Sequence, residues 1–254
     1  MRIPLSKYGL PEVVTLPTLT LTVMIAYLIV GASALVPLPV WAIVSVEAVL
    51  AVLLSAVLLF FRDPDRHIEK DPDILLAPAD GKITDIETTD YTDAVKRSDG
   101  LTVGRFDGRT GGAKNPDAVL RIGIFMSIFD THINRAPCNS IVEKVTYKQG
   151  KYINAMDPKS SQINESNDLG LVRTDSPEDK LVVRQISGAI ARRIVCATFP
   201  GEELATGQKF GMIKFGSRCE LYVPIREDVK CLVKIGDKVK AGLTPLVKYE
   251  VSQK

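Results

Sequence analysis

The chain has 254 residues, of which 46% are hydrophobic and 24% charged, and its 32 basic and 30 acidic side chains nearly cancel. This balance argues against nucleic acid as a partner, because nucleic-acid binding requires a strongly basic surface. Four cysteines without a C-x-x-C pair, and only two histidines, argue against a zinc site and a disulfide framework. We therefore expect no metal and reduced thiols, which suit the cytosolic side of a membrane.

Two long apolar runs open the chain. Residues 16–36 carry no charge, and residues 38–61 carry only Glu47. Each run is long enough to cross a hydrocarbon core of about 30 Å as a helix. The two prolines of the intervening "VPLPV" separate the runs. Residues 1–61 are therefore predicted to form a transmembrane helical hairpin.

Basic residues flank this hairpin on both sides, with Arg2 and Lys7 before it and Arg62 and Arg66 after it. The positive-inside rule places both ends in the cytoplasm, so we expect a multi-pass protein of the cell membrane whose remaining chain is cytoplasmic. A secretory signal peptide is disfavoured because the apolar stretch is too long and is doubled. The costly carboxyl of Glu47 is either functional, or protonated or bonded to a hydroxyl of the partner helix.

Strand-like runs fill residues 62–254, among them "AVLRIGIFMSIF", "IVEKVTYKQG", "KLVVRQIS", "ARRIVCATF" and "VKCLVKIGDKVKAGLTPLVKYEV". Apolar residues alternate with polar ones along these runs, a pattern typical of strands. The sequence thus predicts an α+β protein, in which a mainly antiparallel β domain with few helices follows the hairpin. Polar, turn-rich residues 86–118 and 151–180 are expected to form an irregular insertion and a loop.

Three polar interruptions of these runs could carry chemistry. "APADGKI" contains Asp80, "FMSIFDTHINRAP" contains His132 and Arg135, and "MIKFGSRCELYVPI" contains the pair Gly216-Ser217. Each alone is typical of a turn, but together they supply an acid, a base and a hydroxyl, the parts of an activated serine. A serine-hydrolase elbow would place Gly-x-Ser-x-Gly between a strand and a helix, whereas this serine lies between two strands.

The ordered set "FFRDPDR", "PADGKI", "FMSIFDTHINRAP" and "FGSR" resembles the phosphatidylserine decarboxylase family in its short prokaryotic form. The likeness covers residues 60–254. It implies a catalytic domain that cleaves itself between Gly216 and Ser217. In this scheme the Ser217 hydroxyl attacks the Gly216 carbonyl, the resulting ester is eliminated, and chains 1–216 and 217–254 result. The former serine becomes a pyruvoyl group.

The resemblance also implies the activity. The pyruvoyl group would form an imine with the amine of phosphatidylserine or archaetidylserine, accept electrons as carbon dioxide leaves, and yield the ethanolamine phospholipid. Neither pyridoxal phosphate nor a metal is then needed. The two cleaved chains would stay associated in the membrane. The sequence leaves open whether the protein forms a homo-oligomer and whether the lipid tails are ester- or ether-linked.

Individual roles follow from the same resemblance. His132 would be the base for self-cleavage, and Asp80 would orient it. Many relatives carry a second histidine where this chain has Arg135, and an arginine cannot act as a neutral base. We expect Arg135 to bind a substrate anion instead, the alternative being a pairing with Asp130 or a loop carbonyl. Arg62 and Arg66 would lie near lipid phosphates, or serve only as a membrane anchor.

A different class of protein remains as an alternative. The pattern Val-x-x-Gly-Asp-x-Val-x-x-Gly at residues 233–242 is similar to hairpins of biotinyl and lipoyl carrier domains. With "APADGKI", it allows a membrane-tethered carrier or adaptor domain without catalysis. Such carriers present a modified lysine at a hairpin tip, and this sequence lacks that motif.

Overall fold

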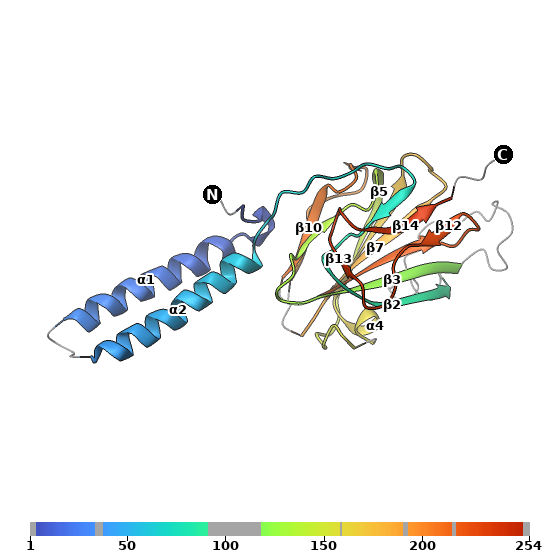
Figure 1. The fold of residues 1–254 in the computed structure, drawn as a ribbon. Helices are drawn as coiled ribbons and strands as arrows, with labels where there is room; N and C mark the ends of the chain where they lie inside the picture. The colour runs from blue at the N-terminus through green and yellow to red at the C-terminus, as the bar shows by residue number, and fades with distance from the viewer. Residues whose placement is uncertain are drawn as a thin grey trace. The chain divides into compact units, whose positions relative to one another are not determined.

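The computed structural model describes residues 4–33, 38–90, 118–157, 159–189, 193–214 and 217–250 (Figure 1). The chain divides into two compact units, Met1–Asp65 and Arg66–Lys254. The division falls four residues after the boundary expected from the loss of apolar character at residue 61. Each unit is considered by itself below.

The first unit contains a short 3₁₀ helix, η1 (Lys7–Gly9), and two long helices, α1 (Glu12–Ala32) and α2 (Val40–Phe60). Both long helices are long and apolar enough to cross a membrane. Two apolar helices in this stretch were predicted and are present, but α1 begins and ends four residues earlier than expected. The prediction followed the uncharged run, whereas a carboxylate such as that of Glu12 is favourable in the first turn of a helix.

Close packing joins the two helices, because a side chain at Gly31 would collide with Ile43. Hydroxyl groups along the helices bond to their own backbones; those of Thr22 and Ser45 donate to the carbonyl oxygens four residues earlier. Oε1 of Glu47 is buried and has no hydrogen-bond partner among the residues that the structure describes. The bond to a partner-helix hydroxyl that the sequence allowed is therefore not made by this oxygen.

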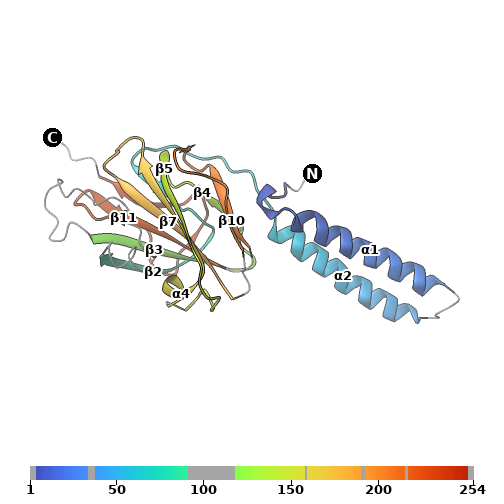
Figure 2. The same ribbon diagram turned by 180° about the vertical axis from the view of Figure 1, so that it is seen from behind.

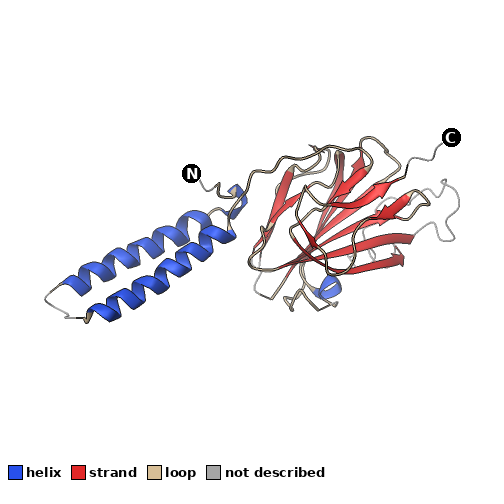
Figure 3. Cartoon of the chain, in the orientation of Figure 1, coloured by secondary structure: helices blue, strands red, loops and turns tan. Residues whose placement is uncertain are grey.

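The second unit consists mainly of strands (Figure 3). In chain order they are β1 (Ile74–Leu76), β2 (Gly81–Asp90), β3 (Ala118–Met126), β4 (Ile133–Arg135), β5 (Ser140–Lys148), β6 (Ser166–Arg173), β7 (Lys180–Ser187), β8 (Arg193–Cys196), β9 (Glu203–Leu204), β10 (Lys209–Lys214), β11 (Ser217–Pro224), β12 (Val229–Cys231), β13 (Lys238–Val239) and β14 (Pro245–Tyr249).

All pairings between these strands are antiparallel, as predicted. Eight of them form one sheet in the order β13-β2-β3-β11-β7-β6-β5-β9, and two three-stranded sheets have the orders β4-β10-β8 and β1-β14-β12. A single short helix, α4 (Ser160–Ile163), lies within the described part of this unit. The sequence therefore predicted the class of this domain correctly.

Two predicted irregular regions require correction. Strand β2 continues to Asp90 and β3 begins at Ala118, so the ends of the predicted 86–118 insertion are strands; residues 91–117 lie outside the described residues. The predicted loop 151–180 contains both α4 and the whole of β6. Strand β6 reads as a loop because it is polar, yet its polar side chains are buried and bonded to the adjacent strand.

Strand β11 occupies the middle of the large sheet, between β3 and β7 (Figure 2). Side chains of a strand alternate between its two faces. On one face Cys219, Leu221 and Val223 are fully buried in the apolar core. Ser217 lies on that face by register. The opposite face carries Arg218 and Glu220 together with Tyr222, and these side chains are buried as well.

Candidate functional site

Ser217 is the first residue of β11. It pairs with Met126 at the end of β3 and with Ser187 at the end of β7, and its side chain is fully buried. Its hydroxyl donates to Sδ of Met126 at 3.3 Å, and a thioether is a weak acceptor. Gly216, the other half of the predicted cleavage site, lies outside the described residues. The structure thus places the predicted reactive serine in a buried position at the end of a central strand of the sheet.

His132 lies at the entrance to β4 and is fully buried. Its carbonyl oxygen accepts the backbone N–H of Ile213 in β10, four residues before Ser217. Nδ1 of the imidazole lies 3.0 Å from the carbonyl oxygen of Asp130. Because a carbonyl can only accept, Nδ1 carries the hydrogen, and Nε2 of the neutral ring keeps its lone pair. In a neutral imidazole with its hydrogen on Nδ1, the proton-accepting nitrogen is Nε2.

Asp80 lies in the turn before β2 and is held by an arginine. Nη1 and Nη2 of Arg66 donate to its two carboxylate oxygens at 2.6 and 2.7 Å, and the backbone N–H of Ala241 donates to Oδ1 at 2.8 Å. Both side chains of the pair are largely buried. The structure therefore brings together Asp80 and Arg66, whereas Nδ1 of His132 is bonded to the Asp130 carbonyl.

The other two predicted arginines bond to backbone carbonyls. Arg135 in β4 is buried, and its Nη1 donates to the carbonyl oxygen of Gly207 at 2.9 Å. This is the kind of loop-carbonyl contact that the sequence allowed as an alternative to substrate binding. Arg62 belongs to the first unit, where its Nη1 donates to the carbonyl oxygen of Leu59 in the last turn of α2. Arg62 and Arg66 are thus in different units.

Buried amide side chains near Ser217 were not predicted from the sequence. Nε2 of Gln185 in β7 donates to Oδ1 of Asn134 in β4 at 2.9 Å, and both side chains are fully buried. Gln185 lies on the same face of the large sheet as Ser187, the cross-strand partner of Ser217. Asn164 donates to the carbonyl oxygen of Ser187 at 2.8 Å. A polar residue inside an apolar strand, as in "KLVVRQIS", was the available signal.

The opposite face of β11 carries a buried ionic network. Nε of Arg218 donates to Oε1 of Glu220 at 2.7 Å, and its Nη2 bonds to Asp85 of β2. Arg121 of β3 also donates to Oε1 of Glu220, at 2.9 Å, and the Tyr222 hydroxyl donates to Oε2 at 2.6 Å. The fully buried Glu220 therefore connects β11 to the neighbouring strand β3.

Opposing influences set the pKa of Glu220. Burial raises it, but the positive charges of nearby arginines outweigh burial and hold the pKa below the ordinary value of 4.5. Gly123 in β3 makes room for this arrangement, because a Cβ there would collide with the Arg218 guanidinium and the Asp85 carboxylate. The residue that follows Ser217 is consequently fixed by charges on two strands.

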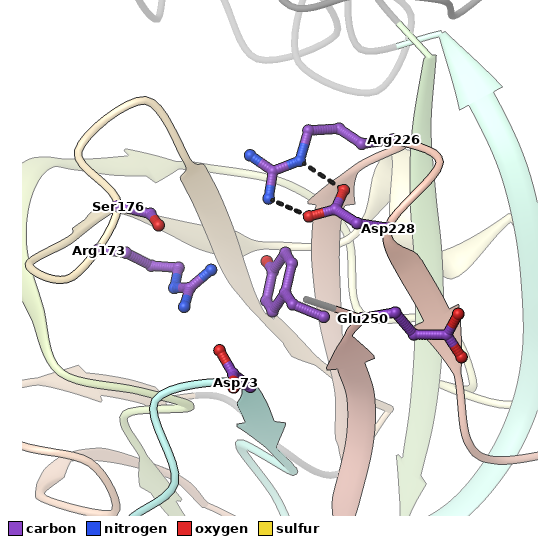
Figure 4. A pocket seen from close by; sticks show the side chains of 7 residues that line it. Asp73, Arg173, Ser176, Arg226, Asp228 and Glu250 are labelled. Atoms are coloured by element: carbon purple, nitrogen blue, oxygen red, sulfur yellow. Dashed lines mark hydrogen bonds and ion pairs between the residues drawn. The ribbon is translucent and has the colours of Figure 1, made fainter. Parts of the chain in front are cut away.

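A polar pocket of about 150 Å³ lies beyond the other end of β11 (Figure 4). The guanidinium carbons of Arg173 and Arg226 lie 4.1 and 5.2 Å from the centre of the Tyr249 ring, and Arg226 is ion-paired with Asp228. At about 3.3 Å per residue, the length of β11 puts this pocket more than about 20 Å from Ser217. It is not part of the serine site.

Comparison with known proteins identifies the family of this chain. A family model described as phosphatidylserine decarboxylase matches residues 53–246. The chain belongs to the phosphatidylserine decarboxylase family.

Individual relatives agree with this assignment. The phosphatidylserine decarboxylase proenzyme of Desulfotalea psychrophila is 39% identical over 189 residues, which cover 74% of this chain and 77% of the relative. That of Cupriavidus taiwanensis is 38% identical over 195 residues, covering 77% and 79%. That of Burkholderia ambifaria is 35% identical over 226 residues, covering 83% and 94%. Membership of the phosphatidylserine decarboxylase family decides against the carrier-domain alternative.

Phosphatidylserine decarboxylases generally carry a pyruvoyl group made from a serine, and the surroundings of Ser217 fit such a group. It is small and uncharged, and Ser217 is fully buried on a face that continues into the apolar core. The amides of Gln185 and Asn134 supply polarity without charge. Burial of this kind suits a ketone that must be kept from bulk water.

Proposed function

We propose that this chain is a self-processing, membrane-anchored phosphatidylserine decarboxylase whose pyruvoyl group derives from Ser217. The observation that carries the proposal is the position of Ser217 in a chain of this family. It is the fully buried first residue of a central strand, directly after the Gly216-Ser217 bond that the family pattern marks for cleavage.

For self-cleavage we assign the nucleophile to Ser217 and the base to Nε2 of His132. The hydroxyl attacks the Gly216 carbonyl, and the acyl group moves from nitrogen to oxygen. Loss of the Ser217 α-proton then releases the Gly216 carboxylate and leaves a dehydroalanine. Its enamine takes up water and loses ammonia, which leaves the pyruvoyl group at the new N-terminus. The Asp130 carbonyl keeps the hydrogen on Nδ1, so Nε2 is the nitrogen that accepts the hydroxyl proton. Glycine at position 216 would admit the hydroxyl without a clash at Cβ.

Asp80 acts in this scheme through Arg66. Their doubly hydrogen-bonded pair, with the Ala241 amide, connects the start of the second unit to the turn before β2 and to the segment after β13. A buried bidentate pair of this kind fixes geometry. The Asp80 turn precedes β2, whose neighbour β3 ends beside Ser217.

For turnover, the pyruvoyl carbonyl supplies an acceptor for the electrons released as carbon dioxide leaves the serine headgroup. Around it, the amides of Asn134 and Gln185 orient the polar headgroup, and burial excludes water. We assign the lipid phosphate to Arg135, because clamping the carboxylate instead would stabilise the ground state against its loss.

Membrane attachment follows from the substrate. A diacyl phospholipid does not leave a bilayer readily, so its enzyme must work at the surface. The apolar helices α1 and α2 serve as the transmembrane anchor, and basic residues at both ends place the second unit on the cytoplasmic face. The Arg62 side chain at the end of α2 lies where anionic headgroups would be met.

The test is the fate of the chain and of the lipid in one preparation. Intact mass spectrometry of the membrane-purified protein should show two chains, 1–216 and 217–254, with a hydrazine-reactive ketone on the shorter one. Ser217→Ala should leave one chain and no decarboxylation. Cys219→Ala, two residues along on the same buried face, is the matched control and should cleave. An intact wild-type chain that decarboxylates the lipid would overturn the proposal.

A further inference from the structure

An exposed apolar loop leads into the proposed active site. Strand β3 ends at Met126, β4 begins at Ile133, and between them Ile128 is 50% exposed and Phe129 80% exposed. No other large hydrophobic side chain that the structure describes is as exposed as Phe129. Keeping a phenylalanine in water is unfavourable, and a contiguous exposed apolar pair marks an interaction surface more often than a lone residue does.

Hydrogen bonds hold this loop in a closed turn. The backbone N–H of Ser127 donates to Oδ2 of Asp130 at 2.8 Å, and the Asp130 N–H donates back to the Ser127 carbonyl at 2.9 Å. The N–H of Phe129 lies 3.3 Å from Oγ of Ser127. The Asp130 carboxylate is thereby used within the turn, and the two apolar side chains are presented at its tip.

The turn lies at the same sheet edge as the reactive serine. Met126, one residue before the turn, is the cross-strand partner of Ser217, and His132 directly follows the turn. Exposed Arg193 begins β8 opposite Lys214, three residues before Ser217. Exposed apolar side chains and an exposed cation therefore both lie within a few residues of the partners or neighbours of Ser217.

We propose that the turn 127–131 is a membrane-docking element, which inserts Ile128 and Phe129 into the phospholipid bilayer surface beside the active site. The inference rests on the proposed function, because a substrate with two acyl chains requires the catalytic edge to lie against the bilayer. Aromatic and aliphatic side chains fill the boundary between headgroups and acyl chains, and Arg193 meets the anionic headgroups above it. The partner is the lipid surface itself, not a protein groove.

Depth-dependent quenching of fluorescence tests the insertion without any need for activity. The chain has one tryptophan, Trp41, so Trp41→Phe provides a silent full-length background. Phe129→Trp places the probe in the turn. Phe199→Trp is the matched control, because Phe199 is 64% exposed and follows the end of β8 that lies farther from Ser217 along β10.

Both variants are reconstituted in phosphatidylcholine–phosphatidylserine vesicles whose acyl chains carry bromine. The Phe129→Trp variant should have blue-shifted emission and be quenched, whereas the Phe199→Trp variant should be neither. Equal quenching of the two variants, or none in either, would overturn the docking proposal. The outcome is the same whether or not the chain cleaves itself, so a failure of the proposed function is read separately, from the mass of the chain and the release of carbon dioxide.

Kinetics supply the second measurement. Phe129→Ser should cleave normally and act normally on monomeric short-chain phosphatidylserine, while its KM for phosphatidylserine in vesicles rises about tenfold, a fraction of the effect of burying a whole phenylalanine. Phe129→Leu should restore most of the loss. An equal loss on monomeric substrate would mean that the turn acts on His132 rather than on the bilayer, and would overturn the proposal.

Discussion

The two faces of β11 differ in almost every respect except burial. One face carries Ser217 and then only side chains of the apolar core, and the Ser217 hydroxyl, the proposed nucleophile, has a weakly accepting sulfur as its hydrogen-bond partner. The other face, one residue away, carries Arg218 and Glu220 in a dense network of ion pairs. The apolar face supplies a dry place for chemistry, and the ionic face supplies the directional bonds that hold the strand in register.

This division teaches how a buried strand can be reactive and immobile at once. Apolar packing is not directional, so it tolerates small shifts of a strand end. Charge-assisted hydrogen bonds are directional and lose much of their energy with a small displacement. Placing them on the face away from Ser217 restrains the backbone and keeps these charges off the face that carries the serine. Substitutions on each face should separate the contribution of the buried serine side from that of the ionic network.

Loss of the base on the reactive side should have the largest effect. His132→Ala should slow self-cleavage about 10²- to 10⁴-fold, the usual contribution of a positioned general base. The measurement is the fraction of cleaved chain over time after synthesis. His67→Ala removes the only other histidine, which is exposed in the second unit, and should cleave at the wild-type rate. Normal cleavage by His132→Ala would place the base elsewhere.

On the ionic face, Glu220→Gln should mainly lower the free energy of unfolding. It leaves Arg218 and Arg121 without their shared buried carboxylate, and breaking such a buried network costs about 3–5 kcal/mol. Denaturant unfolding in a Ser217→Ala background, where the chain stays whole, measures the change. Glu87→Gln removes the 58%-exposed partner of the same Arg121 and should cost about 1 kcal/mol or less. Similar costs for both substitutions would contradict a special role for Glu220.

The same carboxylate predicts a pH dependence. The pKa of Glu220 is lower in the folded chain than its ordinary value of 4.5, so its stabilising contribution is complete above that value and is lost as pH falls through the folded pKa. The difference in unfolding free energy between the Ser217→Ala chain and its Glu220→Gln derivative should therefore be constant from about pH 7 to pH 5 and shrink below about pH 4. If this difference in unfolding free energy increased as the pH fell, the predicted pH dependence would be wrong.

Substitutions in the Asp80–Arg66 pair should slow self-cleavage less, and they test whether Asp80 acts through Arg66. If Asp80 acts by bracing, Asp80→Asn and Arg66→Gln should each slow cleavage about tenfold, and the double substitution should be no slower than the worse single one. Quantitative gels of cleavage over time give all four rates. Multiplicative rates in the double variant would indicate instead that Asp80 acts independently of Arg66, through His132.

The smallest effect is expected at Arg135. Arg135→Ala should still cleave, because the guanidinium donates to Gly207 rather than to a residue of the cleavage site. Its KM for phosphatidylserine should rise about tenfold or less, the worth of one charged hydrogen bond, with a smaller change in kcat. If the cleaved variant has unchanged KM and kcat, Arg135 has only a structural role, through its hydrogen bond to the Gly207 carbonyl.

Much of the fold was predictable because local patterns dominate it. Uncharged runs located α1 and α2, and alternation in "KLVVRQIS" located β7 with its correct ends. Strand β6 was missed because its polarity is satisfied by distant partners; Asp168 bonds to Arg184 and Asn167 to Gln185. Whether a polar side chain of one strand is hydrogen-bonded by another strand depends on the tertiary structure, and it leaves no periodic pattern in the sequence.

The site was predictable only in part, for the same reason. The Gly216-Ser217 step between two strand-forming runs marked the reactive position, and four ordered motifs gave the family. The sequence did not single out Arg218 and Glu220, and only the pairing of β11 with β3 and β7 reveals that both are buried. Arg66 and Asp80 belong to separate motifs, so their ion pair required the structure.

With the proposed cleavage, the central position of β11 would make maturation irreversible, because the cleaved protein could not readily refold. Cleavage before Ser217 would assign β11, β12, β13 and β14 to the short chain, yet β11 remains hydrogen-bonded on both sides to strands of the long chain. Before cleavage an unfolded chain can refold as one polymer. Afterwards, refolding requires two chains to meet and a middle strand to be inserted, so the lifetime of the enzyme is set by its unfolding rate rather than by an equilibrium.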